Sequence, residues 1–323
     1  MNRADRVRDR ILKTLADGKF HSGEFLGDSL GISRAAISKH IKSLAELGLE
    51  IYSVTGKGYR LASALSLLDG SKILTARAHS APATLEVMHV IDSTNAYLKA
   101  KLNELTNGHA CVAEAQTAGR GRHGRPWISP YGASLYLSLY WSFPGGYQSV
   151  SGLSLAVGVA VAQALQDIDV EGVQLKWPND IYLDDKKLAG VLIEVEGQMG
   201  ASCDCVIGIG LNIDMPQQQS AIDQPWTDIK HARGMVVDRN LLCANLLDRL
   251  DSCLTQFEHN GLQAFVEPWR SLDLYRDKQI KLLLGQQTIL GTCRGINEVG
   301  ALLLESEGQL KGYYGGEISV RPA

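Results

Sequence analysis

The stretch of this 323-residue chain with the clearest chemical potential is a loop in which glycine and arginine alternate. It reads Gly119-Arg120-Gly121-Arg122-His123-Gly124-Arg125-Pro126-Trp127 and lies between two predicted strands, Cys111–Ala115 and Leu135–Trp141. Glycine lets backbone amides approach a ligand closely, and arginine side chains bind phosphate oxygens. We expect the loop to bind a phosphate group and, since it has little apolar surface, to become ordered with its ligand. A solvated basic loop or a disordered RNA-binding tract would explain the same pattern equally well.

Three further stretches place polar residues or glycines at the ends of predicted strands. Asp92-Ser93-Thr94-Asn95 begins a helix, where capping alone would explain serine or threonine. Lys176-Trp177-Pro178-Asn179-Asp180 and Lys186-Lys187-Leu188-Ala189-Gly190 fit strand, turn, strand, turn, strand, and a lysine at a hairpin end is usually only solvated. Gly208-Ile209-Gly210-Leu211-Asn212 puts two glycines on one strand, which favours a close approach by a ligand or another backbone. Each stretch alone is a weak signal.

The elements that must position these residues divide the chain unevenly by charge. Residues 1–60 carry eleven Lys or Arg and seven Asp or Glu, whereas the remaining residues carry 21 and 28. A basic first segment on an acidic body indicates a nucleic-acid-binding module attached to a domain with another activity.

The basic segment has the pattern of a winged helix-turn-helix. One helix buries Val7, Ile11, Leu12 and Leu15, Ser22 caps a second that ends before Gly31, and Ser33 caps a third. Two short strands, Ile51–Val54 and Tyr59–Leu61, then flank a basic turn. We expect DNA contacts from polar residues of the helices and from the wing: Ser22, Ser33, Arg34, Ser38, Lys39, Lys42 and Lys57. A helical bundle without a DNA-binding role is the alternative.

From about Leu65 the pattern changes to strands and helices without regular alternation, which favours an α+β fold with a mixed sheet. Further strands are predicted at Leu85–Ile91, Val173–Trp177, Leu188–Val195 and Val206–Ile213, and helices at Thr94–Leu105, Gly152–Leu165 and Leu241–His259. After Tyr275 short strands separated by glycine-containing turns predict a small β-barrel. They are Gln279–Leu284, Thr288–Ile296, Ala301–Glu305, Leu310–Tyr314 and Ile318–Arg321. We therefore predict three domains, 1–64, 65–274 and 275–323.

The composition of the chain indicates the cellular compartment in which the protein works. No apolar run approaches the roughly 20 residues of a membrane helix, and the N-terminus lacks the apolar core of a signal peptide. The six cysteines are scattered, and the Cys203–Cys205 pair has no obvious metal-site partner. A cytoplasmic protein with reduced cysteines and no membrane association is the expectation.

Taken together, the motifs resemble those of biotin–protein ligases of the bifunctional type that also repress the biotin operon. The resemblance rests on Ser93-Thr94-Asn95, Gln116, the loop 119–125, Lys176–Asp180, Lys187–Gly190 and Gly208–Asn212. It extends through all three predicted domains in the expected order. It implies a class II synthetase-like mixed sheet and an SH3-like C-terminal barrel.

The same resemblance implies roles for individual residues. Biotin would be bound by Ser93, Thr94, Asn95, Gln116, Arg120, Gly121, Arg122 and Lys187. ATP and the adenylate would be bound by Arg122, Lys187, Asn179, Asn212 and Trp226, with the loop between Asn212 and Ile229 ordering around adenine. Catalysis would fall to Lys187, Arg120 and Arg122, with Mg²⁺ carried on the nucleotide; direct protein ligands to the metal and the role of Asp180 stay undefined.

The implied reaction converts biotin and ATP to biotinyl-AMP and pyrophosphate, then transfers biotin to a lysine of a biotin carboxyl carrier protein. The adenylate-bound protein would form a homodimer and repress biotin synthesis genes at operator DNA. Two alternatives stay open: a transcription factor that senses a small molecule without catalysis, and a ligase for lipoate or a related acid.

Overall fold

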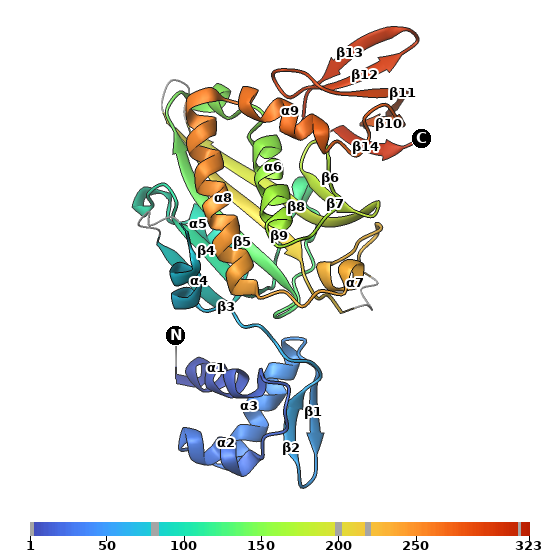
Figure 1. Ribbon diagram of the computed structural model, residues 1–323. Helices are drawn as coiled ribbons and strands as arrows, with labels where there is room; N and C mark the ends of the chain where they lie inside the picture. Colours follow the sequence, from blue (N-terminus) through green and yellow to red (C-terminus); the bar gives the residue numbers. More distant parts are fainter. Residues whose placement is uncertain (1–2, 79–83, 198–201, 217–220, 316–317) are drawn as a thin grey trace.

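The computed structural model describes residues 3–78, 84–197, 202–216, 221–315 and 318–323. Figure 1 shows three successive regions along the chain: a small helical region, a large mixed sheet covered by helices, and a small C-terminal sheet. The predicted α+β fold with an N-terminal winged helix-turn-helix is confirmed.

The N-terminal region contains three helices and a two-stranded wing. Its elements are α1 (Arg3–Leu15), α2 (Gly23–Leu30), α3 (Arg34–Glu46), β1 (Ile51–Val54) and β2 (Gly58–Leu61). Ser22 and Ser33 cap α2 and α3 by accepting hydrogen bonds from Phe25 N and Ala36 N. Gly31 ends α2 with a φ of 66°, the left-handed conformation that glycine adopts at least cost.

This region rests directly on the central one. The apolar cluster around Ile37 and Leu44 includes Ala115 and Tyr131 from the central region. Leu65 N donates to Ala16 O at 2.9 Å, and His89 Nε2 lies 3.2 Å from Asp9 Oδ1. The winged helix therefore shares packed and polar contacts with the body of the protein.

The central sheet has seven strands in the order β3-β4-β5-β9-β8-β7-β6. The β3–β4 pair is parallel and the other pairs are antiparallel, so the sheet is mixed. The strands are β3 (Leu85–Ile91), β4 (Ala110–Gln116), β5 (Ser134–Phe143), β6 (Val173–Lys176), β7 (Asp180–Leu183), β8 (Lys186–Gly197) and β9 (Cys203–Asn212). All predicted strands of this region are present, with ends that differ by up to three residues.

Two long helices cover one face of the sheet, α6 (Leu153–Gln166) and α8 (Arg239–Asn260), with α9 (Gln263–Ser271) beside them (Figure 1). The 21-residue stretch Gly146–Gln166, which begins with the 3-10 helix η3 (Gly146–Val150), is apolar enough to cross a membrane by length and composition. This finding corrects the expectation that no such run exists. Within it, 61% of an 18-residue apolar window is buried, because α6 packs against both the sheet and α8.

Some helices differ from the prediction. The expected helix Thr94–Leu105 is α5 (Thr94–Lys99) followed by the 3-10 helix η1 (Leu102–Glu104). Lys101 N bonds to the carbonyl three residues back rather than four, which tightens the chain so that Leu98 and Leu102 reach one small apolar cluster. Three helices were not predicted: α4 (Gly70–Ala76) and α7 (Ile229–Arg233), which are short, and α9, which contains Pro268.

The C-terminal region is a five-stranded antiparallel sheet in the order β13-β12-β11-β10-β14. Its strands are β10 (Gln279–Leu284), β11 (Gln287–Ile296), β12 (Leu302–Ser306), β13 (Gln309–Tyr313) and β14 (Ile318–Pro322). Trp177 Nε1 donates to Gly300 O at 3.0 Å, so the turn between β6 and β7 is tied to this sheet.

A buried ion pair joins β4, the segment before α4 and the start of α8. Arg239 donates to Glu114 at 2.6 Å and to Ser134 O at 2.7 Å, and Glu114 also accepts from Leu68 N. Both charged side chains are 2% exposed. The hydrogen bonds offset part of the cost of burying these charges.

Candidate active site and DNA-binding face

One cavity of about 300 Å³ opens between the sheet, the arginine–glycine loop and the C-terminal strand β14. Every residue predicted to bind biotin, ATP or the adenylate lines it. These are Ser93, Thr94, Asn95, Gln116, Arg120, Gly121, Arg122, Asn179, Lys187, Asn212 and Trp226. Residues spread over more than 130 positions of the sequence therefore meet at one place.

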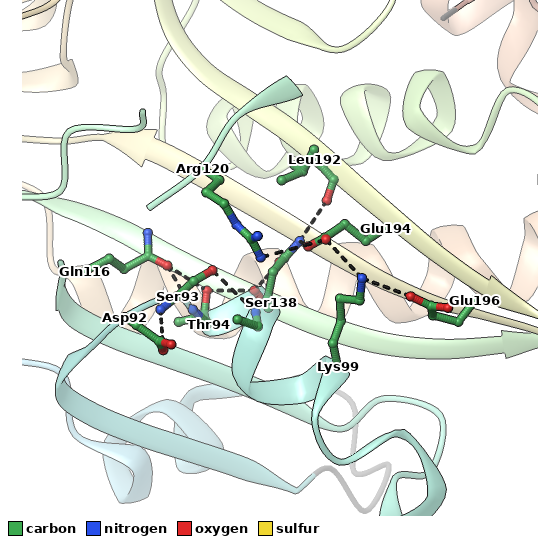
Figure 2. A network of polar contacts seen from close by, with 12 residues as sticks. Asp92, Ser93, Thr94, Lys99, Gln116, Arg120, Ser138, Leu192, Glu194 and Glu196 are labelled. Carbon is green, nitrogen blue, oxygen red and sulfur yellow. Dashed lines mark hydrogen bonds and ion pairs between the residues drawn. The ribbon is translucent and has the colours of Figure 1, made fainter. Parts of the chain in front are cut away.

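The start of α5 forms a hydrogen-bonded wall of this cavity (Figure 2). Ser93 caps α5, so Thr94 and Asn95 in its first turn are turned toward the sheet, and all three side chains are buried. Thr94 N donates to Gln116 Oε1 at 2.9 Å, which places the end of β4 beside the helix. Ser138 Oγ lies 2.7 Å from Thr94 Oγ1 and 2.5 Å from Asn95 Oδ1.

The two glycines of β9 form the floor of the cavity. A Cβ on Gly208 would lie 2.3 Å from Asn95 Oδ1, and a Cβ on Gly210 would lie 2.4 Å from a ring atom of Trp127. Both side chains lie directly on the strand, which explains why glycine is required at a position where it normally weakens a sheet.

The arginine–glycine loop is folded back on itself. Gly121 N donates to Arg125 O and Trp127 N donates to Gly119 O, at 2.7 and 2.8 Å. It contains the 3-10 turn η2 (Arg122–Gly124), and Trp127 provides the apolar anchor that the sequence analysis did not recognise.

The two arginines predicted to be catalytic differ in environment. Arg120 is 46% exposed, with Nη2 at 3.9 Å from Glu194 Oε1. Arg122 Nη1 donates to Asn179 Oδ1 at 3.2 Å, so the loop contacts the turn between β6 and β7. Burial lowers the pKa of Arg122, although Asp180 acts in the opposite direction. A desolvated guanidinium of this kind binds an anion more strongly than an exposed one.

Lys187 lies at the junction of several parts of the site. Its Nζ is 2.7 Å from Asp180 Oδ1 and 5.4 Å from the centre of the Trp127 ring. Its backbone pairs with the loop after β9, since Lys187 N donates to Pro225 O and Thr227 N donates to Lys187 O. Trp226 is therefore held next to Lys187.

Asn212 and the loop that follows it lie at the same end of the cavity. Asn212 Nδ2 donates to Thr227 O at 3.1 Å. Met215 N donates to Asp228 Oδ2, and Asp228 also caps α7, so both ends of the loop are fixed. Residues 217–220, which belong to the loop predicted to order around adenine, lie outside the described residues.

Further cations line the cavity, among them Lys176 and Arg321. Lys176 belongs to one of the motifs of the sequence but had no predicted role; it is buried, donates to Tyr182 Oη at 3.0 Å, and has its pKa lowered to about 8 by burial. Arg321 reaches the cavity from β14 of the C-terminal sheet. An arginine in a short terminal strand carries no local pattern that would assign it to a ligand site.

The described residues contain no group of three or more His, Cys, Asp or Glu side chains that could hold a metal ion. The six cysteines, all in the described part of the chain, are buried, and none of them forms a disulfide bond.

Most of the predicted DNA-binding residues are exposed side chains of the N-terminal region. Ile37, Ile41 and Leu44 of α3 face inward, which leaves its polar side chains outward. Arg34, Lys39 and Lys42 on α3 and Lys57 on the wing are exposed, as are the capping residues Ser22 and Ser33, while Ser38 is half-buried. In Figure 1 this region lies at the end of the molecule away from the C-terminal sheet.

A mixed sheet with a strongly cationic cavity beneath a glycine–arginine loop, joined to a helix-turn-helix, defines an acid-activating ligase with a DNA-binding module. Comparison with known proteins gives the same class. The biotin/lipoate A/B protein ligase family matches residues 87–212, an HTH domain matches 7–60, and the biotin protein ligase C-terminal domain matches 277–321.

Relatives and solved structures extend this result over the whole chain. The chain is 46% identical over 316 residues to the bifunctional ligase/repressor BirA of Salmonella typhimurium and 44% identical over 315 residues to that of Escherichia coli. These alignments cover 97% of this chain and 97% of each relative. A biotin protein ligase from Aquifex aeolicus, solved with biotin and ATP, aligns with a TM-score of 0.66 and 32% identity over 74% of this chain and 99% of that chain.

This chain belongs to the bifunctional biotin ligase/repressor family. The predicted enzyme class, the repressor module, and biotin and ATP as substrates are thereby confirmed. The alternative of a sensor without catalysis is not supported, because the ligase domain is present together with the residues of its cavity.

Proposed function

We propose that the cavity activates the carboxylate of biotin with ATP and that its own cations position the two anionic substrates. The observation that carries this proposal is the place of Lys187, which lies against Asp180, the Trp127 ring and the loop of Trp226. A biotin carboxylate and an ATP phosphate that meet beside Asp180, Trp127 and Trp226 would both contact Lys187.

We assign the polar ring of biotin to the wall formed by Ser93, Thr94, Asn95 and Gln116, which offers hydroxyl and amide groups in fixed orientations. Arg120, Gly121, Arg122 and Lys187 are then placed for the biotin carboxylate. Arg122, Asn179, Lys187, Asn212 and Trp226, which line the same cavity, are assigned to ATP.

In the first step a biotin carboxylate oxygen attacks the α-phosphorus of ATP, and the bond from that phosphorus to the bridging oxygen of pyrophosphate breaks. Both substrates are anions, so positioning and charge neutralisation are the main requirements. Arg120, Arg122 and Lys187 meet them. Magnesium would enter on the phosphate oxygens of ATP, which are ligands it prefers, and would neutralise the leaving pyrophosphate.

In the second step a lysine amine of a biotin carboxyl carrier protein attacks the acyl carbon, loses a proton and expels AMP. The arginine–glycine loop covers the cavity, and exclusion of water would protect the mixed anhydride until the carrier arrives.

The regulatory function rests on the outer surface of the N-terminal region. We assign operator contacts to Ser22, Ser33, Arg34, Ser38, Lys39, Lys42 and Lys57, a set that mixes groups for base edges and for phosphates. A homodimer would present two such surfaces to two half-sites. If the adenylate binds the dimer more tightly than the monomer, it must shift the equilibrium toward the dimer. We place the protein in the cytoplasm, where its buried cysteines stay reduced.

The domain limits 1–64, 65–274 and 275–323 complete the proposal. They are supported by the three matched segments, which fall one within each domain, and by the change from helices to short strands after Tyr275.

Biotin-dependent release of pyrophosphate from ATP, measured for wild type and Lys187→Ala, tests the site assignment. We expect release by wild type and a loss of about a hundredfold in the variant, the effect of removing one preorganised charged donor. If Lys187→Ala released pyrophosphate at the wild-type rate, the assignment of Lys187 to the active site would be wrong. Replacing biotin by lipoate in the same assay tests the remaining alternative, which would require lipoate to be the better substrate.

A further inference from the structure

Glu194 of β8 lies beside the proposed biotin site but belongs to none of the motifs of the sequence (Figure 2). We propose that Glu194 is a positioning residue, which fixes the Asn95 amide and competes with the biotin carboxylate for Arg120, and that Lys99 limits this competition. The inference rests on the proposed function, because it takes Asn95 and Arg120 as biotin ligands.

The secondary structure brings these groups together. Asn95 and Lys99 are four residues apart on α5, so they share one face of the helix. Glu194 and Glu196 are two residues apart on β8, so they share one face of the strand. The two faces meet: Lys99 Nζ lies 3.2 Å from Glu194 Oε1 and 3.0 Å from Glu196 Oε1.

Glu194 determines which way the Asn95 amide points. Asn95 Nδ2 donates to Glu194 Oε2 at 2.9 Å and to Leu192 O at 3.3 Å. A carboxylate and a carbonyl can only accept hydrogen bonds, so the amino group must face them. Asn95 Oδ1 consequently faces Ser138 Oγ, which also contacts Thr94. Without the acceptor at Glu194, only the longer hydrogen bond to Leu192 O holds the Asn95 amide in this orientation.

Arg120 approaches the same carboxylate from the loop. Its Nη2 lies 3.9 Å from Glu194 Oε1, the oxygen that also accepts from Lys99. The Arg120 side chain is 46% exposed and that of Glu194 is 20% exposed, so this long contact is weakened by solvent and can be exchanged. A biotin carboxylate that binds Arg120 must draw it away from Glu194.

Lys99 sets how strongly Glu194 attracts Arg120. Hydrogen bonds to Glu196 and then to Glu194 raise the pKa of Lys99, so its charge persists across the physiological range. Because Lys99 shares Oε1 of Glu194 with Arg120, it reduces the negative charge that Arg120 experiences. Removing Lys99 should therefore hold Arg120 more firmly at Glu194, whereas neutralising Glu194 should release it.

The test compares biotin with biotinol, which has the same ring system but an alcohol in place of the carboxylate, by calorimetric titration of the full-length protein. We expect Glu194→Gln to tighten biotin binding about two- to fivefold and Lys99→Met to weaken it by a similar factor, the range for a partly exposed ion pair. Neither should change biotinol binding. In pyrophosphate release both changes should appear in KM for biotin and leave kcat unaltered.

Two further variants separate this role from a structural one. In an Arg120→Gln background the effect of Glu194→Gln should vanish; if it persists, a general electrostatic field and not competition for Arg120 is responsible. Glu194→Ala removes the acceptor for Asn95 and should weaken biotinol binding, whereas Glu194→Gln keeps an acceptor there. Equal biotin affinity in wild type, Glu194→Gln and Lys99→Met would overturn the inference, while biotin-dependent pyrophosphate release by wild type would leave the proposed function standing.

Discussion

Two glycines of β9 determine how closely side chains of the proposed biotin site can approach the sheet. Gly208 and Gly210 leave the space that the Asn95 amide and the Trp127 ring occupy. Both are places where one added methyl group would collide with a side chain that is itself fixed by neighbours.

Gly208→Ala is expected to raise the Kd for biotin about fivefold or more. The new Cβ would lie 2.3 Å from Asn95 Oδ1, so the amide must leave Ser138 or Glu194 and lose a hydrogen bond of about 1 kcal/mol. Calorimetric titration with biotin measures the effect. Gly315→Ala is the control: among the described residues, apart from its chain neighbours, no atom lies within 4 Å of its added Cβ, and it should bind biotin like wild type. Unchanged binding by Gly208→Ala would show that Asn95 does not contribute.

Lys176 should give the stability of the protein a distinct pH dependence. Burial lowers its pKa from 10.5 to about 8, so between these values the folded state has lost a proton that the unfolded state still binds. The free energy of unfolding attributable to Lys176 must therefore rise from about pH 8 to 10.5. Lys176→Met should lack this rise in urea unfolding, whereas Lys311→Met on exposed β13 should retain it. If the free energy of unfolding changed with pH in the same way in wild type and Lys176→Met, the lowered pKa of Lys176 would be contradicted.

At the scale of elements, the Glu114–Arg239 pair joins β4 to the start of α8 through buried charges. Arg239→Met is expected to lower the free energy of unfolding by about 3–5 kcal/mol, because Glu114 is left buried without its counter-charge. Urea unfolding measures this loss. Arg249→Met lies on the same helix and removes a partly exposed pair with Asp167, so it should cost about 1 kcal/mol or less. Similar losses in both variants would mean that burial of the pair has no consequence.

The elements also show how far sequence reasoning extends. Strands such as Ser134–Phe143 were predictable because their apolar residues alternate with the period of a strand, and α6 was predictable because its apolar run is too long for a strand. Short helices such as α4 and α7 contain too few turns to show a period. In the candidate site, Arg120 and Lys187 were found through motifs, whereas Glu194 and Arg321 act only through the neighbours that the tertiary fold gives them.

At the scale of the whole molecule, the residues proposed to bind DNA belong to the N-terminal region, whereas the cavity is lined by residues of the central and C-terminal regions. Lys39→Ala is expected to weaken operator binding and to reduce the slope of log affinity against log salt by about 1, the effect of losing one phosphate contact. Biotin-dependent pyrophosphate release should stay at the wild-type rate. Lys311→Ala, an exposed lysine of the C-terminal sheet, should change neither measurement. An unaltered salt slope for Lys39→Ala would remove this lysine from the DNA contacts.

The winged helix is seated on the body of the protein through Tyr131, the Asp9–His89 pair and the bond from Leu65 N to Ala16 O. Helix α3, which we propose as the recognition helix, therefore has a set direction relative to the central sheet. In the proposed homodimer two recognition helices would stand a fixed distance and angle apart, and the operator would need one spacing between its half-sites. Five extra base pairs at the centre would turn one half-site to the opposite face of the duplex. The second winged helix could not reach it, because, among the described residues 3–78, no flexible linker joins the module to the body of the protein.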